Sequence, residues 1–244
     1  MPITSQADTQ PLNANATQFP VTHSLLSPEA LRRHLQVTYD IGEVHACILL
    51  QHNLNDTYLV ETTTGRYVLR VSQAPRPIGA SWRTLDDILF EVDVLLHLVS
   101  KGVSVAAPVP QRDGAYTFQV QAPEGARHVT LFTYAVGEPV SASKQTEPLA
   151  HRYGQAVARL HTATDDFASP HPGLALDLDF LLTKPLTIVA PFLSKRPADW
   201  QYVRSLGTLL TERLDQLQAS GLDQGLCHGD AQGGNAHIAT DGIL

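Results

Sequence analysis

Cysteine is scarce in this sequence, which has only Cys47 and Cys227 among its 244 residues. The two lie far apart along the chain, so the disulfide framework that is typical of small secreted proteins is excluded. We expect two buried free thiols, which belong in a reducing compartment, and therefore predict a cytoplasmic protein.

Long hydrophobic runs are also missing. No apolar stretch approaches the roughly 20 residues that a membrane-spanning helix needs. The first twenty residues have neither the basic start nor the apolar core of a secretory signal. We predict that residues 1–22 form a flexible tail and that the protein has no membrane partner.

Basic residues are in the minority. Seventeen Lys and Arg stand against twenty-four Asp and Glu, giving a formal net charge of −7. A phosphate-rich polymer would be repelled by this charge, so we expect no nucleic-acid partner, although a local basic pocket for one nucleotide stays possible. The eleven histidines show no paired spacing typical of metal ligands, which argues against a zinc site or a metal hydrolase.

What the sequence does contain is enough apolar residue, 43%, for one large or two small domains. Turn residues and hydrophobic periodicity predict a mixed α+β protein. The expected strands are His45–Gln51, Asp56–Thr62, Arg66–Ser72, Ala115–Gln121, His128–Gly137 and a short one after Asn235. The expected helices are Ser27–Gln36, one that Ser81 or Thr84 caps and Lys101 closes, Glu147–His161 and Ala198–Ala219. The segment Asp165–Pro197 has no clear pattern.

The stretch LCHGDAQGGN, residues 226–235, concentrates groups that suit phosphoryl transfer. It places Asp230 and Asn235 five residues apart on one loop. A carboxylate can accept the proton of an attacking hydroxyl, and an amide oxygen can ligate magnesium. The alternative is a Gly-rich turn in which Asp230 caps a backbone amide.

A second candidate lies in the third strand, where Arg70 stands between Leu69 and Val71. A cation embedded in an apolar strand needs a partner, and Glu91 lies beside the apolar stripe of the next helix. An ordinary ion pair on a half-exposed strand is the alternative.

HGDAQGGN resembles the HGD-x-x-x-x-N loop of the aminoglycoside phosphotransferase and choline kinase-like family, and the resemblance extends over residues 37–244. Within it, the segments NDTYLV, YVLRV, PEGAR and LFTYAVGEP look most like the homoserine-kinase-like branch. The resemblance implies a two-lobed protein-kinase-like fold. It has a small antiparallel β lobe with one helix at residues 23–136, and a mostly helical, incomplete large lobe at residues 137–244.

The resemblance also implies roles for particular residues. Asp230 would orient the hydroxyl and accept its proton, with His228 bracing the loop. Arg70, positioned by Glu91, would grip the ATP phosphates, and Asn235 would hold Mg²⁺. The hairpin tip around Asn55 would cover the phosphates, and the backbone of Phe132, Thr133 and Tyr134 would meet adenine.

The expected function is ATP- and Mg²⁺-dependent phosphoryl transfer to a hydroxyl of a small molecule, such as an aminoglycoside, homoserine or choline. The alternative is a nucleotide-binding pseudokinase or an inactive kinase fragment. The second metal-binding Asp of the family would follow a return strand after Asp241-Gly242, where the sequence ends. We therefore expect a chain truncated at its C-terminus and slow by itself. The sequence determines neither the acceptor nor the oligomeric state.

Overall fold

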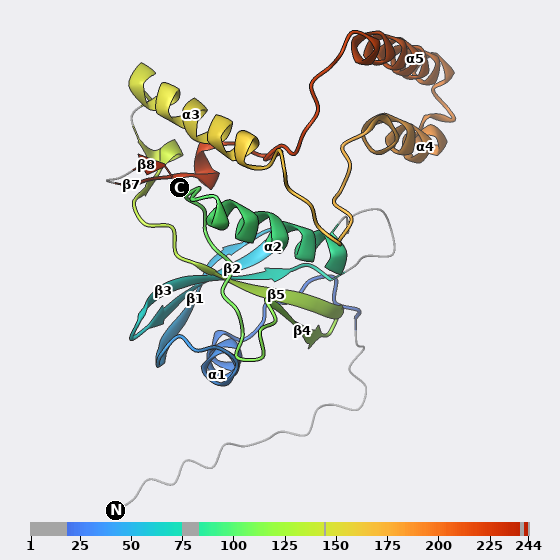
Figure 1. Ribbon diagram of the computed structural model, residues 1–244. Coiled ribbons are helices and arrows are strands. Elements are labelled where there is room, and N and C mark those ends of the chain that lie inside the picture. The colour runs from blue at the N-terminus through green and yellow to red at the C-terminus, as the bar shows by residue number, and fades with distance from the viewer. Residues whose placement is uncertain (1–18, 75–82, 144, 240–241, 244) are drawn as a thin grey trace, which may run out of the picture.

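The computed structural model describes residues 19–74, 83–143, 145–239 and 242–243, and it has two lobes (Figure 1). Most of the expected tail, together with Ser81 and Asp241, therefore lies outside the described residues. No helix in the described ranges combines the length and the hydropathy needed to cross a bilayer.

The first lobe is built on a five-stranded antiparallel sheet with the order β1-β2-β3-β5-β4. Its strands are β1 (Val44–His52), β2 (Asn55–Thr62), β3 (Gly65–Ser72), β4 (Thr117–Ala122) and β5 (Gly125–Thr133). All five predicted strands of this lobe are confirmed. Along β2 every second residue is buried, as expected for a strand with one face on a core.

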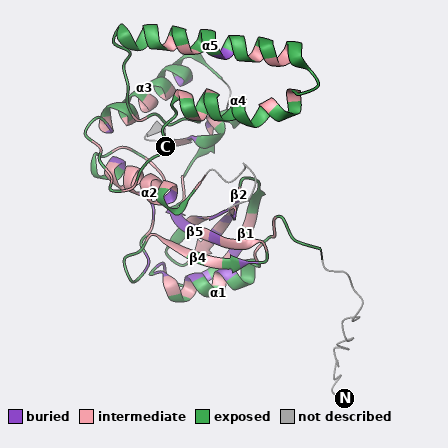
Figure 2. Ribbon diagram, turned by 90° about the vertical axis from the view of Figure 1, so that its right-hand side faces the viewer, coloured by how far each residue is buried: buried purple, intermediate pink, exposed green. Residues whose placement is uncertain are grey.

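Two helices cover opposite faces of this sheet (Figure 1). Helix α1 (Pro28–Thr38) begins with Ser27 as its N-cap and buries Leu31 and Leu35 against the sheet. Helix α2 (Leu85–Ser100) begins at Thr84, whose side chain forms a capping box with Asp87. The buried residues lie mainly between α1 and the sheet, as Figure 2 shows.

The second lobe begins with α3 (Glu147–Ala163) and continues with α5 (Pro197–Ala219), close to the two predicted helices. Between them the structure has a π-helical turn (Asp179–Thr183), α4 (Lys184–Val189) and a 3-10 turn (Ala190–Leu193), which the sequence pattern did not reveal. Pro185 and Pro191 interrupt the periodicity there because proline cannot sit in a helix interior without loss of a hydrogen bond.

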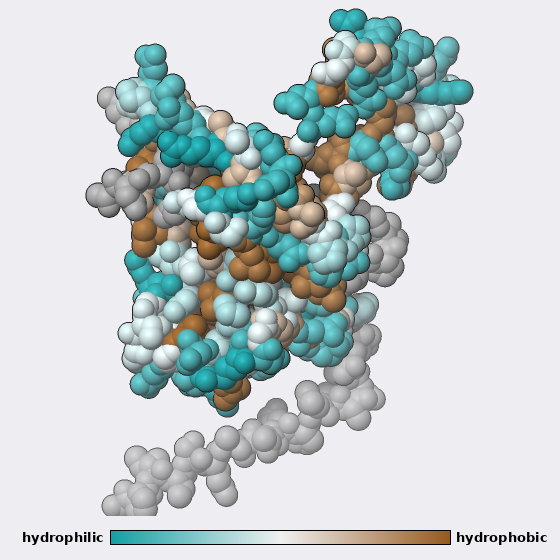
Figure 3. Space-filling view, in the orientation of Figure 1, coloured by the Kyte–Doolittle hydropathy of each residue, from teal (hydrophilic) through white to brown (hydrophobic). Residues whose placement is uncertain are grey.

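Apolar side chains lie on the surface of the segment that carries α4 and α5 (Figure 3). On α5 the side chains of Leu206, Leu210 and Leu217 are all exposed. Part of the apolar face of this helix is therefore uncovered in the described part of the chain.

A small second sheet joins β6 (Glu138–Pro139), β7 (His237–Ala239) and β8 (Gly242–Ile243). The sequence predicts an interlobe hinge at Gly137–Pro139, and here Glu138 pairs with Ile238 and Pro139 with His237. The two-residue return strand β8 pairs with β7. The start of the second lobe is therefore tied to the segment just after Asn235.

One cysteine prediction is wrong. Both thiols are free, but only Cys47 is buried, whereas Cys227 is exposed. Burial raises the pKa of the Cys47 thiol to about 11, which keeps it protonated at neutral pH. Cys227 lies at the end of an extended, largely exposed segment that leads to Asp230, where it is not covered by the core.

Candidate active site

The strand cation and the helix glutamate meet as the sequence predicted. Arg70 Nη1 donates to Glu91 Oε1 at 2.9 Å, and Arg70 Nη2 donates to Glu91 Oε2 at 2.6 Å. This two-pronged geometry is the strong form of the arginine–carboxylate pair. The pair is partly buried, with the Arg70 and Glu91 side chains 22% and 28% exposed.

Two further residues belong to this cluster. Arg83, just before α2, also pairs with Glu91, and the Arg70 guanidinium lies over the Phe132 ring, with Cζ 4.7 Å from the ring centroid. Sequence reasoning missed Arg83 because it precedes the helix and belongs to no periodic pattern. Two guanidiniums on one carboxylate leave a net positive charge, which suits an anionic ligand.

The ionisation of Glu91 reflects this environment. Burial by itself raises the pKa of Glu91, but attraction and hydrogen bonds from Arg70 and Arg83 outweigh it and hold the pKa below its ordinary value. The carboxylate is therefore charged at neutral pH.

We expect Glu91→Gln to cost stability at neutral pH and much less in acid. A carboxyl group whose pKa is lowered by folding stabilises the protein above its unfolded pKa, near 4.3 for Glu, and this contribution is lost as pH falls through the folded value. Urea midpoints of wild type and variant should differ at pH 7 and converge below about pH 4. A difference that stays constant with pH would contradict the assignment.

Residues 226–235, which carry Asp230 and Asn235 and are called the acid–amide loop below, are stabilised by hydrogen bonds of their own side chains. Asn235 Nδ2 donates to the Asp230 backbone carbonyl at 3.0 Å and to Asp230 Oδ2 at 2.8 Å. The Asp230 amide donates to His228 Nδ1 at 3.3 Å, so His228 braces the loop as predicted. Among the described residues no backbone N–H donates to the Asp230 carboxylate, so the capping alternative does not describe this loop. The side chains of His228, Asp230, Gln232 and Asn235 are all exposed.

Contacts in and just after the loop attach it to the start of the second lobe. The Val140 amide donates to the Ala236 carbonyl at 2.8 Å, and Tyr153 Oη donates to the Gln232 carbonyl at 3.3 Å. Glu138, which pairs with Ile238, follows Thr133 at the end of β5 by five positions. Such a segment spans at most about 18 Å. The strand that follows Asn235 therefore pairs within about 18 Å of the end of β5.

Gly137 makes this junction possible, and we expect Gly137→Ala to disrupt it. The residue has φ +97°, and an added Cβ would overlap the carbonyl of Ile238. An alanine held in this left-handed conformation costs about 1–2 kcal/mol of stability, and the clash of its Cβ with the Ile238 backbone adds to that cost. Chemical denaturation should show this loss. Gly154→Ala in α3, where a Cβ meets open space, should instead be neutral or stabilising; equal effects of the two changes would refute the argument.

The predicted adenine contacts fall at this strand end. Thr133 donates its amide to the Ala107 carbonyl at 2.8 Å, and its hydroxyl accepts from the Ala107 amide at 2.9 Å. The Thr133 N–H is therefore already engaged. Tyr134 follows the strand, and the Arg66 guanidinium lies over its ring, with Cζ 4.1 Å from the ring centroid.

Residues 163–173, which begin at the last residue of α3, contact helix α2. His97 Nε2 donates to the Ala163 carbonyl at 2.9 Å, and Ser169 Oγ donates to Asp93 at 2.6 Å. Asp166 pairs with Lys101 and His97, a contact that lowers the pKa of Asp166 chiefly through the Lys101 hydrogen bond. These interlobe contacts fix the helix that presents Glu91, and the sequence gave no sign of them.

Three acidic residues between α3 and α4 have structural partners. Asp166 binds α2 as described, Asp179 pairs with Lys184 at 2.9 Å, and Asp177 accepts from the Phe180 amide at 2.8 Å. In the described ranges one group has metal-ligand composition, His23, His52 and Asp56. This group lies in the first lobe and includes no residue of the acid–amide loop.

The sheet, the helix with its glutamate and the acid–amide loop define a protein of the protein-kinase-like fold. Residues 47–244 match the family described as the phosphotransferase enzyme family, and the chain belongs to that family.

Similar proteins agree with this membership. An uncharacterized protein of Deinococcus radiodurans is 36% identical over 236 residues, covering 97% of this chain and 66% of that protein. A homoserine kinase of Paraburkholderia phymatum is 31% identical over 200 residues, covering 79% of this chain and 54% of that kinase. A solved amicoumacin kinase, in complex with AMP-PNP, Ca²⁺ and Ami, has a TM-score of 0.61 and 19% identity, covering 88% of this chain and 61% of that one. The chain thus spans two thirds or less of the length of these relatives.

Proposed function

We propose that this protein transfers the γ-phosphoryl group of ATP to a hydroxyl of a small molecule. The observation that carries the proposal is the pairing of Arg70 with Glu91 in a chain that also holds Asp230 and Asn235 together on one loop. Phosphoryl transfer needs positioning and charge neutralisation more than covalent chemistry, and these two groups supply them. The first lobe, residues 23–136, would bind the nucleotide and residues 137–244 would supply the catalytic loop.

Asp230 is the proposed catalytic base. Its carboxylate is exposed and accepts hydrogen bonds from the Asn235 and Gln232 side chains, which orient it without neutralising it. A substrate hydroxyl that donates to this carboxylate is directed at the phosphoryl group, and its proton passes to Asp230 during attack. His228 would keep the loop in shape through the Asp230 amide.

The phosphates would bind on the first lobe. Arg70 and Arg83 exceed the charge of Glu91 by one. Because Glu91 already accepts from both Nη atoms of Arg70, phosphate oxygens would meet the remaining N–H donors of the two guanidiniums. The hairpin tip that includes Asn55 would lie over the phosphates, and the backbone at Tyr134 would meet the adenine edge. Thr133 is less suited because its N–H is taken.

A divalent cation fits the chemistry of the loop. Asn235 offers a carboxamide oxygen, one of the hard oxygen ligands that magnesium prefers. Asn235 Oδ1 accepts no hydrogen bond from the described residues, so it is free to hold Mg²⁺. When bound, the ion would neutralise charge on the phosphates.

The acceptor class is a hydroxyl-bearing small molecule. Because the P. phymatum relative is a homoserine kinase at 31% identity, homoserine is the first acceptor to test, followed by choline and an aminoglycoside.

The test measures ATP binding by calorimetry and acceptor-dependent ADP release with Mg²⁺, with phosphorylated product read by ³¹P NMR. We expect ATP binding and slow turnover with one acceptor class. ATP binding without turnover on any acceptor would select the pseudokinase alternative, and absence of ATP binding would overturn the proposal.

A further inference from the structure

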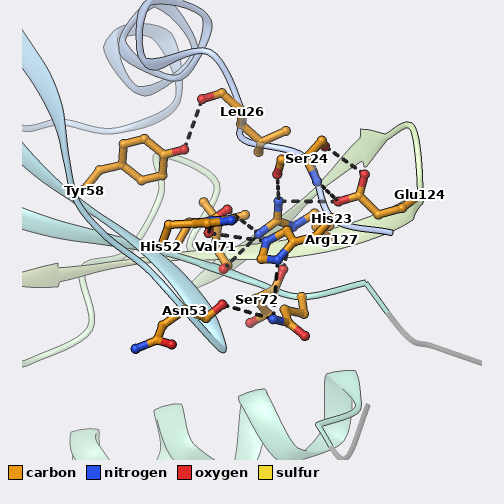
Figure 4. Close-up of polar contacts among 12 residues, drawn as sticks. His23, Ser24, Leu26, His52, Asn53, Tyr58, Val71, Ser72, Glu124 and Arg127 are labelled. Atoms are coloured by element: carbon orange, nitrogen blue, oxygen red, sulfur yellow. Dashed lines mark hydrogen bonds and ion pairs between the residues drawn. The ribbon is translucent and has the colours of Figure 1, made fainter. Parts of the chain in front are cut away.

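Arg127 is a fully buried cation at the start of β5. Its Nε donates to the Ser72 carbonyl at 2.8 Å, its Nη1 to the Ser24 carbonyl at 2.8 Å and its Nη2 to Asp56 Oδ2 at 2.6 Å. Figure 4 shows the guanidinium at the centre of these contacts. It thus joins the segment before α1, the end of β3 and the start of β2.

Asp56 is also fully buried, and its second oxygen faces two histidines. Asp56 Oδ1 accepts from His52 Nδ1 at 2.6 Å and lies 3.4 Å from His23 Nε2. The His23 and His52 rings lie together beside Arg127 in Figure 4, with centroids 4.3 Å apart. The Coulomb and hydrogen-bond partners of this carboxylate therefore come from three separate segments of the chain.

These contacts also link the two ends of the β1–β2 hairpin tip, which consists of residues 53–55. His52 and Asp56 are register partners on either side of residues 53–55, so their side-chain hydrogen bond closes the tip. Gln73 Nε2 donates to the Asn53 carbonyl at 3.0 Å and ties the tip to the chain just after β3. Arg70 lies two residues before Ser72, the β3 residue that Arg127 holds.

The three-residue group invites comparison with a metal site, since its ligand atoms lie within 4.8 Å of one another. Two contacts favour hydrogen bonds instead. The Gln73 amide nitrogen, which donates to the Asn53 carbonyl, also lies 3.5 Å from His23 Nδ1, so this ring nitrogen already faces a hydrogen-bond donor. The Arg127 cation on the same carboxylate also opposes a bound cation.

We propose that Asp56 and Arg127, with His52 and Gln73, are positioning residues that hold the hairpin tip at a fixed place relative to Arg70, so that the tip covers the nucleotide phosphates. This inference rests on the proposed function for the phosphates, but the ordering of the tip stands on the contacts alone. The ligand class is the triphosphate of a nucleotide.

The test uses His52→Ala and Gln73→Ala in the full chain, because neither change leaves an unpaired buried arginine. We expect hydrogen exchange of the amides of residues 53–55 to become roughly tenfold faster, the magnitude expected for loss of one hydrogen bond. The ATP dissociation constant and KM should rise about three- to tenfold while kcat stays within about twofold.

Two further variants sharpen the test. His52→Gln keeps a donor for Asp56 and should restore most of the slow exchange. His45→Ala removes an exposed histidine at the opposite end of β1 and should change neither exchange nor ATP affinity.

Three results would overturn the inference in distinguishable ways. Unchanged exchange at residues 53–55 would show that the contacts do not order the tip. Faster exchange with unchanged ATP affinity would show that the ordered tip does not serve phosphate binding. Tight binding of zinc alone, lost in His23→Ala, would replace the hydrogen-bond network by a metal site. If the wild-type protein binds no ATP, the proposed function fails and the phosphate role fails with it, while exchange still decides the ordering.

Discussion

Asp230→Asn is expected to lower kcat for phosphoryl transfer by roughly 10²–10⁴-fold, the usual contribution of a positioned general base. The change keeps the shape of the side chain and an oxygen that can accept from Asn235, so the loop should keep its conformation. What is lost is the charge that accepts the proton. Steady-state kinetics with saturating acceptor and ATP measure the effect.

Ground-state binding provides the internal check on this variant. Because Asp230 acts on the hydroxyl and not on adenine or its phosphates, the ATP dissociation constant should stay within about threefold of wild type. Asp223→Asn, which neutralises an exposed acid seven residues earlier, should leave kcat unchanged. Retained turnover in Asp230→Asn would remove Asp230 from the catalytic role.

Arg127→Met is expected to lower the free energy of unfolding by about 3–5 kcal/mol, the typical cost of removing one partner from a buried ion pair. The change leaves the Asp56 carboxylate, which is fully buried, with only histidine partners, and it removes donors from the Ser24 and Ser72 carbonyls. Urea denaturation followed by circular dichroism measures the loss.

A surface pair of the same chemistry serves as the control. Arg112 lies 3.5 Å from Asp40 and both side chains are mostly exposed, so Arg112→Met should change stability by no more than about 1 kcal/mol. Combining Arg127→Met with Asp56→Leu should cost less than the sum of the two single changes, because the double variant buries neither Arg127 nor Asp56 without its partner. Strict additivity would show that the two side chains are not coupled.

The elements of this fold were largely predictable because their signals are local. Helix caps at Ser27 and Thr84, alternation in the strands and the apolar stripe of α2 each depend on residues within a few positions of one another. The same holds for the acid–amide loop, whose two polar groups are five residues apart. The Arg70–Glu91 contact was predictable from the order of strand and helix, since a cation in an apolar strand needs a partner nearby.

Contacts between distant segments gave no such signal. Arg127 ends the segment PEGAR, which was of note in the sequence only for its resemblance to the homoserine-kinase-like branch. It is nevertheless the most deeply buried cation of the first lobe among the described residues. Arg83 and the contacts of residues 163–173 with α2 escaped notice for the same reason. The secondary structure of residues 165–197 could not be predicted for a different reason. The prolines there divide the chain into short helical turns that show no hydrophobic period.

The sequence by itself thus determined the kinds and order of the elements, and it identified the two groups best suited to phosphoryl transfer. Hydrophobic periodicity and capping are encoded within one or two turns of chain, so no partner segment is needed to read them. Only the tertiary structure decided which charges are buried together. Such a decision depends on desolvation, and residues as distant as Ser24, Asp56 and Arg127 lose their water only when the chain has brought them into contact.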